Sequence, residues 1–133
     1  MTLSALLRTA AGLLLLLFVA QSAQAVERRP YDDAAFASAQ QRGAPILVEV
    51  TAPWCPTCRA QKPIIEKLAA QPANKDLVIF SVDFDSQKVA VRKFEARSQS
   101  TLVAFRGAAE TARSVGDSDE ASIAGLIAST VKR

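Results

Sequence analysis

Two cysteines separated by two residues, Cys55 and Cys58, are the residues of this chain best suited to chemistry. A pair at this spacing can form and break a disulfide within one turn of chain, which is redox chemistry. The run at residues 46–50 is short and mostly β-branched, and it predicts a buried strand just before the pair. A helical pattern begins at Pro56, a residue favoured in the first turn of a helix. We therefore expect Cys55 at a helix N-terminus, where unpaired amides and the helix dipole favour the attacking thiolate.

Two other uses of the cysteine pair are weaker. A structural disulfide that closes so short a loop constrains the unfolded chain little, by less than about 3 kcal/mol. Zinc usually takes four nitrogen or sulfur ligands, whereas this chain has two cysteines, one methionine and no histidine. One chain cannot complete such a site, although two chains in a dimer could. Redox catalysis is therefore the leading interpretation, and a non-enzymatic metal-binding or redox-sensing module that uses the same pair is the alternative.

Glu49 is a lone acid in the apolar run, six residues before Cys55. Its side chain either lies at an exposed edge or faces inward, where burial without a partner is costly. Burial would raise its pKa toward the range in which a carboxyl group can transfer a proton to and from Cys58. The sequence indicates the position of this acid but not its orientation.

The stretch around the cysteines resembles the active site of the thioredoxin superfamily. The resemblance rests on the strand acid Glu49, on Trp54 directly before the first cysteine, and on Pro63 five residues after the second. It covers residues 31–131 and implies an α/β, thioredoxin-like fold. It also implies that Cys55 attacks a substrate disulfide, that Cys58 resolves the mixed disulfide, and that Glu49 moves the proton. The residues that the resemblance places at the substrate-binding surface are Trp54, Pro56, Thr57, Gln99 and Ser100.

The pattern along the rest of the chain agrees with that fold. Residues 26–30 are expected to form a short arm. Helices are predicted at residues 31–41, 56–69, 86–95 and 118–131, and strands at residues 46–50, 77–82, 101–105 and 111–115. Strands that alternate with helices, followed by a hairpin and a last helix, predict a central mixed β-sheet flanked by helices on both faces.

Ser100 is the position at which the chain departs from the superfamily. Its members generally have a cis-proline directly before the strand that begins here at Thr101. A cis bond before a residue other than proline costs about 3 to 4 kcal/mol, so the bond between Gln99 and Ser100 is expected to be trans. Serine also offers an amide and a hydroxyl that proline lacks, and either could donate to the Cys55 thiolate. The alternative is that the loop tolerates serine without functional consequence.

Residues 1–25 have the pattern of a cleaved secretory signal peptide. Arg8 precedes an apolar run at residues 10–20, and Ala23, Gln24 and Ala25 form a small-x-small cleavage motif. The run is shorter than the roughly 20 residues that span a bilayer, so stable membrane insertion is not expected. Cleavage after Ala25 would leave residues 26–133 as one thioredoxin-like domain. We expect a periplasmic protein, in a compartment where disulfides persist.

Charge and size restrict the expected partners. Of 16 basic and 13 acidic residues only Arg8 precedes Val26, so the rest of the chain carries a net charge of +2. The basic residues are scattered, which argues against nucleic-acid binding. We expect protein thiol and disulfide substrates, an upstream redox partner such as a membrane electron relay, no dissociable cofactor, and a monomer. The chain resembles the reductive branches of the superfamily more than its oxidases. Those oxidases typically have a large helical insertion, and the 108 residues after Ala25 leave no room for one.

Overall fold

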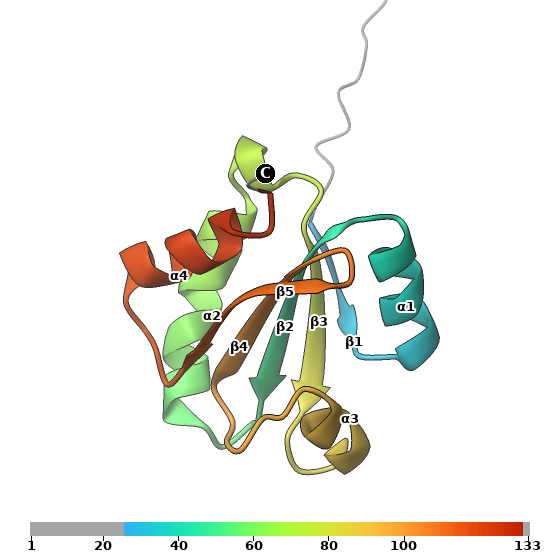
Figure 1. Ribbon diagram of the computed structural model, residues 1–133. Helices are drawn as coiled ribbons and strands as arrows, with labels where there is room; N and C mark the ends of the chain where they lie inside the picture. The colour runs from blue at the N-terminus through green and yellow to red at the C-terminus, as the bar shows by residue number, and fades with distance from the viewer. Residues whose placement is uncertain (1–25, 132–133) are drawn as a thin grey trace, which may run out of the picture.

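The computed structural model describes residues 26–131, so the predicted signal peptide lies outside the described residues. These residues form a five-stranded mixed sheet with strand order β1-β3-β2-β4-β5 (Figure 1). β1, β3 and β2 are parallel to one another, and β4 and β5 run antiparallel as a hairpin at one edge. The helices and strands are β1 (Glu27–Pro30), α1 (Asp33–Gln41), β2 (Pro45–Thr51), α2 (Pro56–Ala69), β3 (Val78–Asp83), α3 (Lys88–Lys93), β4 (Thr101–Arg106), β5 (Ala109–Val115) and α4 (Glu120–Ala128), with a 3-10 turn, η1 (Pro72–Asn74).

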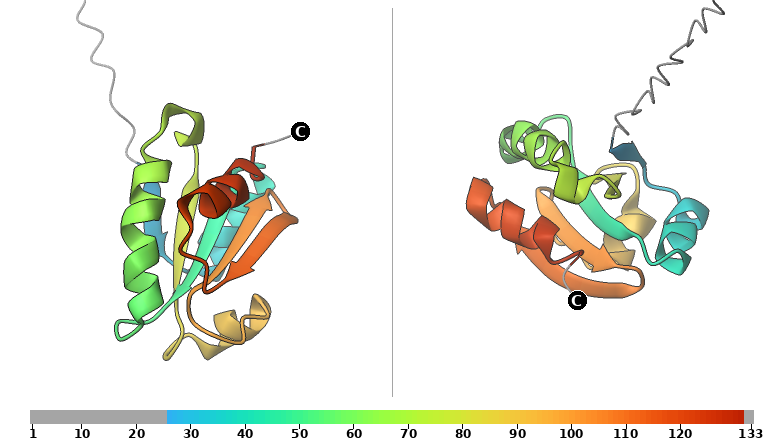
Figure 2. Two further views of the ribbon diagram at one scale, coloured as in Figure 1. Left: turned by 90° about the vertical axis from the view of Figure 1, so that its left-hand side faces the viewer. Right: turned by 90° about the horizontal axis from the view of Figure 1, so that it is seen from above.

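Helices cover both faces of the sheet, as predicted (Figure 2). One core lies under α1 and α3 and is rich in aromatic rings, which pack edge to face around Phe36. The other lies under α2 and α4 and is aliphatic, built from residues such as Leu47, Ile65 and Ile127. The sheet therefore has two apolar faces, and a polar side chain on either face requires a partner.

The central strand, β2, directs Glu49 toward α2. Successive side chains of a strand point to opposite faces. Ile46, Val48 and Val50 belong to the core under α1 and α3, whereas Leu47 belongs to the core under α2 and α4. Glu49 shares the parity of Leu47, so its carboxyl group is buried on the same face as the helix that carries both cysteines.

The segment predicted as an arm at residues 26–30 is in fact an edge strand. β1 pairs in parallel with β3, with Arg28 opposite Ile79. All four of its residues are exposed, so no alternation of apolar and polar residues marked it as a strand. Because Ile79 packs under α2, this register also turns Arg28 to the α2 face.

The helix predicted after the cysteine motif is confirmed, and α2 continues through Pro63 to Ala69. The helix predicted at residues 86–95 starts two residues later than predicted. α3 begins at Lys88 with Gln87 as its N-cap. Ser86 lies before the helix, where Asp83 accepts hydrogen bonds from its hydroxyl at 2.6 Å and from its backbone N–H at 2.7 Å.

No helix within residues 26–131 has the length and apolar character needed to cross a bilayer.

Candidate active site

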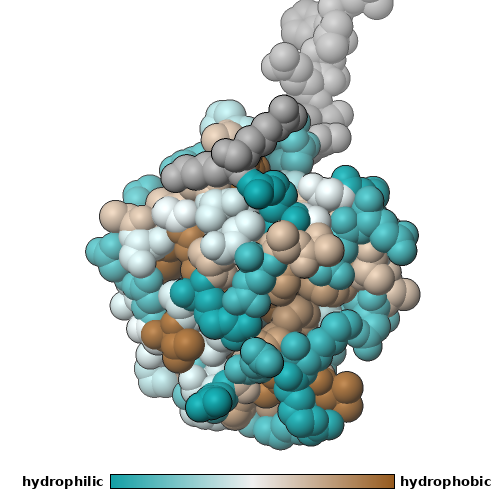
Figure 3. All heavy atoms as spheres, in the orientation of Figure 1, coloured by the Kyte–Doolittle hydropathy of each residue, from teal (hydrophilic) through white to brown (hydrophobic). Residues whose placement is uncertain are grey.

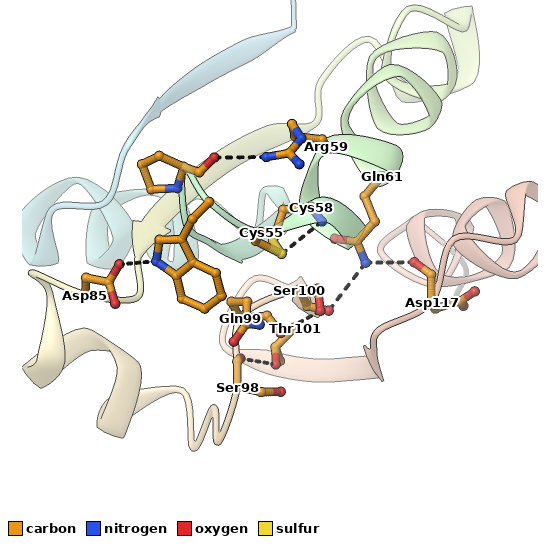
Figure 4. The surroundings of a disulfide bond; sticks show 12 residues. Cys55, Cys58, Arg59, Gln61, Asp85, Ser98, Gln99, Ser100, Thr101 and Asp117 are labelled. Carbon is orange, nitrogen blue, oxygen red and sulfur yellow. Dashed lines mark hydrogen bonds between the residues drawn. A yellow bond between two sulfur atoms is a disulfide. The ribbon is translucent and has the colours of Figure 1, made fainter.

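Cys55 and Cys58 form a disulfide at the first turn of α2, with their Cα atoms 5.3 Å apart (Figure 4). Cys55 is the N-cap residue of the helix, and Pro56 occupies the position where no amide donor is needed. The backbone N–H of Cys58 donates to the Cys55 sulfur at 3.0 Å. After reduction the same donor can stabilise a Cys55 thiolate. The expected placement of Cys55 at a helix N-terminus is confirmed.

A cavity of about 390 Å³ lies beside the disulfide and reaches Glu49. Its lining includes Glu49 and Cys58, which the sheet and α2 bring to the same space although nine positions separate them along the chain. The Glu49 side chain and backbone together are only 7% exposed. A cavity of this size with polar lining groups can hold water, which can carry a proton between the carboxyl group and the inner cysteine.

Two side chains contact the buried carboxylate. The Arg28 guanidinium forms an ion pair with Glu49 Oε2, and the Ser81 hydroxyl donates to the same oxygen at 3.1 Å. Burial raises the pKa of Glu49 above its usual value, and the charge and hydrogen bond of Arg28 oppose that rise. The sequence did not indicate Arg28 as the partner of Glu49, because Arg28 lies 21 residues before Glu49 in a segment without a strand pattern.

Trp54 lies at the surface beside the disulfide. Its residue is 54% exposed, and its indole Nε1 donates to Asp85 Oδ2 at 2.7 Å. Pro56 is exposed and Thr57 half-buried in the first turn of α2. These three predicted binding residues therefore form one outer rim of the cysteine pair. Asp85, which holds the indole, follows β3 and was not singled out from the sequence.

The other predicted binding residues, Gln99 and Ser100, precede β4 and lie beside the disulfide in Figure 4. The peptide bond between Gln99 and Ser100 is trans, as predicted, and residues 26–131 contain no cis peptide bond. Ser100 is 7% exposed and has a φ of 56°, a left-handed conformation that is uncommon for serine. Its hydroxyl donates to the Gln99 carbonyl at 2.6 Å. Of the two donors expected to reach Cys55, only the Ser100 amide is left for that contact.

Gln61 is a further residue of this region that sequence reasoning missed. It lies one turn after Cys58 on α2 and is 3% exposed. Its amide Nε2 donates to the Asp117 carbonyl at 2.7 Å and to the Ser100 carbonyl at 3.4 Å. The three-residue spacing from Cys58 placed Gln61 on the cysteine face of the helix, which was a signal that could have been used.

Large apolar side chains are exposed at few points of the surface. The most exposed ones within residues 26–131 are Trp54, Val89, Val115 and Val131. On the face shown in Figure 3, the apolar atoms at the lower end form separate patches rather than one continuous area. Within the same residues, no three His, Cys, Asp or Glu side chains are grouped so that they could hold a metal ion.

Comparison with known proteins agrees with this geometry. The family described as Thioredoxin matches residues 28–129. Thioredoxin from Mycobacterium bovis is 32% identical over 92 residues, which cover 68% of this chain and 78% of that protein. Thioredoxin from Chlamydia trachomatis is 34% identical over 82 residues, which cover 62% of this chain and 78% of that protein. The chain spans only 20% of the Mycobacterium leprae protein described as a bifunctional thioredoxin reductase/thioredoxin, at 29% identity.

Solved structures show the same fold. The structure described as Trxlp from Edwardsiella tarda is 44% identical, has a TM-score of 0.74, and the match covers 76% of this chain and 98% of that one. Thioredoxin O2 from Arabidopsis thaliana in its oxidised state is 24% identical with a TM-score of 0.69, and the match covers 82% of this chain and 96% of that one. The second likeness, at lower identity, supports the fold alone.

Proposed function

Since the chain belongs to the thioredoxin family and is a thiol-disulfide oxidoreductase, we propose that it is exported and that it reduces disulfides of other proteins. The Cys55 thiolate attacks one sulfur of the substrate disulfide and releases the other as a thiolate, which leaves a mixed disulfide. Cys58 then attacks the Cys55 sulfur, the substrate leaves as a dithiol, and the Cys55–Cys58 disulfide forms again. Two electrons pass from the protein to its substrate.

Glu49 acts in this scheme as the proton acceptor for Cys58. The inner cysteine must lose its proton before it attacks, and the Glu49 carboxylate lines the same cavity. The ion pair with Arg28 opposes the effect of burial on the Glu49 pKa. The carboxylate form is the one that can accept a proton from Cys58 near neutral pH.

The observation that supports the reducing direction is the small number of polar contacts to the Cys55 sulfur in the disulfide form. A dithiol becomes a strong oxidant when its reduced form is stabilised, as by groups that favour the thiolate. Within residues 26–131 the Cys55 sulfur accepts one backbone hydrogen bond, and no charged side chain hydrogen-bonds to either sulfur. The nearby guanidinium of Arg59 donates instead to the Pro53 carbonyl at 3.3 Å. The connection between β3 and β4 also holds only the six-residue α3, without the helical insertion that oxidases of the superfamily typically have.

The reduction potential of the Cys55–Cys58 pair tests the direction. We expect equilibration with a thiol-disulfide buffer to give a value near that of reducing thioredoxins, about −270 mV, and well below the value of about −180 mV typical of disulfide isomerases. A potential above about −180 mV would overturn the proposed direction. Metal content measured on the same sample tests the metal-binding alternative, in which a metal ion would co-purify with the reduced protein in a ratio of one per one or two chains.

Export is tested on the full chain expressed in a bacterium with an outer membrane. The signal-like pattern of residues 1–25 supports export, and cleavage after Ala25 would make Val26 the first residue of the periplasmic protein. Mass spectrometry of the periplasmic fraction measures this directly. Full-length protein confined to the cytoplasm would contradict the proposal, and with it the expected membrane electron relay as the upstream partner.

A further inference from the structure

The Ser100 carbonyl receives two hydrogen bonds that together bind its loop to the rest of the site. The backbone N–H of Gly116 donates to it at 2.9 Å, and Gln61 Nε2 donates at 3.4 Å. Gly116 follows β5 and Gln61 belongs to α2. Figure 4 shows the Gln61 side chain between the cysteine turn, the Ser100 loop and the loop of Asp117.

These contacts are needed because the conformation of Ser100 is not favoured by serine itself. A left-handed conformation is unfavourable for a residue other than glycine, and it persists only where its surroundings hold it. The Ser100 side chain contributes only a bond to the preceding Gln99 carbonyl, which does not join the loop to another element. The bonds to the Ser100 carbonyl from α2 and from the end of β5 are the contacts that do so.

We propose that Gln61 is a positioning residue that holds the Ser100 loop against the cysteine pair, so that a substrate protein bound on Gln99 and Ser100 presents its disulfide to Cys55. Because Gln61 follows Cys58 on the same helix, the loop moves with the cysteines rather than independently of them. This inference rests on the proposed substrate-binding role of Gln99 and Ser100. Gln61 also lines the cavity that Cys58 and Glu49 line, but its hydrogen bonds go to the Ser100 and Asp117 carbonyls, so we assign it a role through the loop.

The proposal predicts that loss of the Gln61 donors affects the reduction of protein disulfides more than that of small disulfides. A small disulfide needs only the two cysteines, whereas a protein disulfide also needs the loop in its place. Gln61→Met keeps the length of the side chain and removes its donors. We expect the kcat/KM for a protein disulfide such as insulin to fall about 2- to 10-fold, the contribution of one neutral hydrogen bond. The kcat/KM for a small aromatic disulfide should change less than 2-fold.

Asn74→Met provides a matched control. Asn74 is also a buried carboxamide, and its Nδ2 donates to the Leu68 carbonyl at 2.8 Å near the far end of α2. Its loss should lower stability without changing either kcat/KM. The proposal is overturned if Gln61→Met leaves both rates unchanged or lowers both equally, and also if Asn74→Met selectively lowers the rate for the protein substrate. Gln61→Leu serves as the test variant should Gln61→Met not fold.

A second measurement does not depend on turnover. Proline cannot adopt the positive φ of Ser100, so Ser100→Pro should destabilise the protein, and less so once Gln61 no longer holds the loop. The free energies of unfolding of Ser100→Pro, Gln61→Met and the double variant form a cycle. Less-than-additive losses support the coupling, and additive losses overturn it. If the native protein reduced neither disulfide, the proposed function would fail while this cycle would still decide the role of Gln61.

Discussion

The two sides of the cysteine pair are held by different kinds of contact. On the side of Cys58, the cavity contains charged groups, with Glu49 buried against Arg28. On the side of the Ser100 loop, the contacts are neutral, and backbone carbonyls accept from an amide side chain and a backbone N–H. The charged side should respond to pH because the Glu49 carboxyl group gains and loses a proton. The contacts of the neutral side are made by amide and carbonyl groups that do not titrate, so they should not depend on pH.

In the proposed function, this difference gives the two sides different tasks. Proton transfer requires a group whose pKa can be adjusted, and burial against a partly exposed arginine provides such a group. Binding of a substrate protein requires fixed backbone positions, which hydrogen bonds between loops provide. Variants on the two sides should therefore differ in whether their effects depend on pH.

The largest effects come from the cysteines, which both sides serve. Cys55→Ser should abolish turnover because the attacking sulfur is lost. Cys58→Ser should instead accumulate mixed disulfides between Cys55 and substrate proteins, because the resolving thiol is missing. Mass spectrometry under non-reducing conditions detects these adducts. The absence of any adduct from Cys58→Ser in the presence of a protein disulfide would rule out the exchange mechanism.

Glu49→Gln tests the charged side. We expect resolution of the mixed disulfide near neutral pH to slow by about 10²-fold, the lower end of general acid-base catalysis. The deficit should shrink as pH rises, because Cys58 then ionises without help. Stopped-flow kinetics across the pH range measures this, with alkylation of Cys55 as the control that should change little. A deficit that is the same at every pH would remove Glu49 from proton transfer.

Ser100→Pro tests the neutral side. Because the φ of Ser100 is 56° and the proline ring fixes φ near −65°, we expect a loss of about 1 to 3 kcal/mol in the free energy of unfolding. Ser100→Gly is the control, and it should stabilise the protein by up to about 1 kcal/mol since glycine adopts positive φ without penalty. Chemical denaturation measures both. Equal stability of all three proteins would mean that the left-handed conformation is not maintained in solution.

The smallest expected effect is that of Arg28→Met, with Arg29→Met as control because Arg29 pairs with the exposed Glu27 at 2.9 Å. Loss of the Arg28 charge should raise the pKa of Glu49 further, since only the Ser81 hydrogen bond then opposes the effect of burial. A carboxyl whose folded pKa is raised contributes stability below its unfolded pKa, about 4.3, and loses it as pH rises through the folded value. The native protein follows the same rule up to its own Glu49 pKa, so the stability of Arg28→Met relative to the native protein should fall as pH rises from the native Glu49 pKa to the higher pKa of the variant.

Carboxyl carbon chemical shifts of the oxidised protein report the Glu49 titration without interference from the cysteines. An upward shift of the midpoint in Arg28→Met but not in Arg29→Met is the expected result. An unchanged midpoint in both variants would show that the ion pair does not influence Glu49.

Much of the site was predictable because it is local in the chain. The apolar run before Thr51 and the proline after Cys55 each encode their own backbone geometry, so the strand and the helix start follow from neighbouring residues. The trans bond before Ser100 follows from the cost of a cis bond without proline. The sequence left two orientations open for Glu49, buried or at an exposed edge. Glu49 is buried because its strand lies in the middle of the sheet and is covered on both faces.

The partners of these residues were decided only by the tertiary structure. Arg28 reaches Glu49 because β1 pairs with β3, although its four exposed residues have no pattern that predicts a strand. Gln61 reaches the Asp117 carbonyl across 56 positions of the chain. The left-handed Ser100 is held from α2 and from the end of β5, and serine itself does not favour that conformation. Local sequence encodes the elements, whereas the pairing of strands and the packing of helices select which distant polar groups meet.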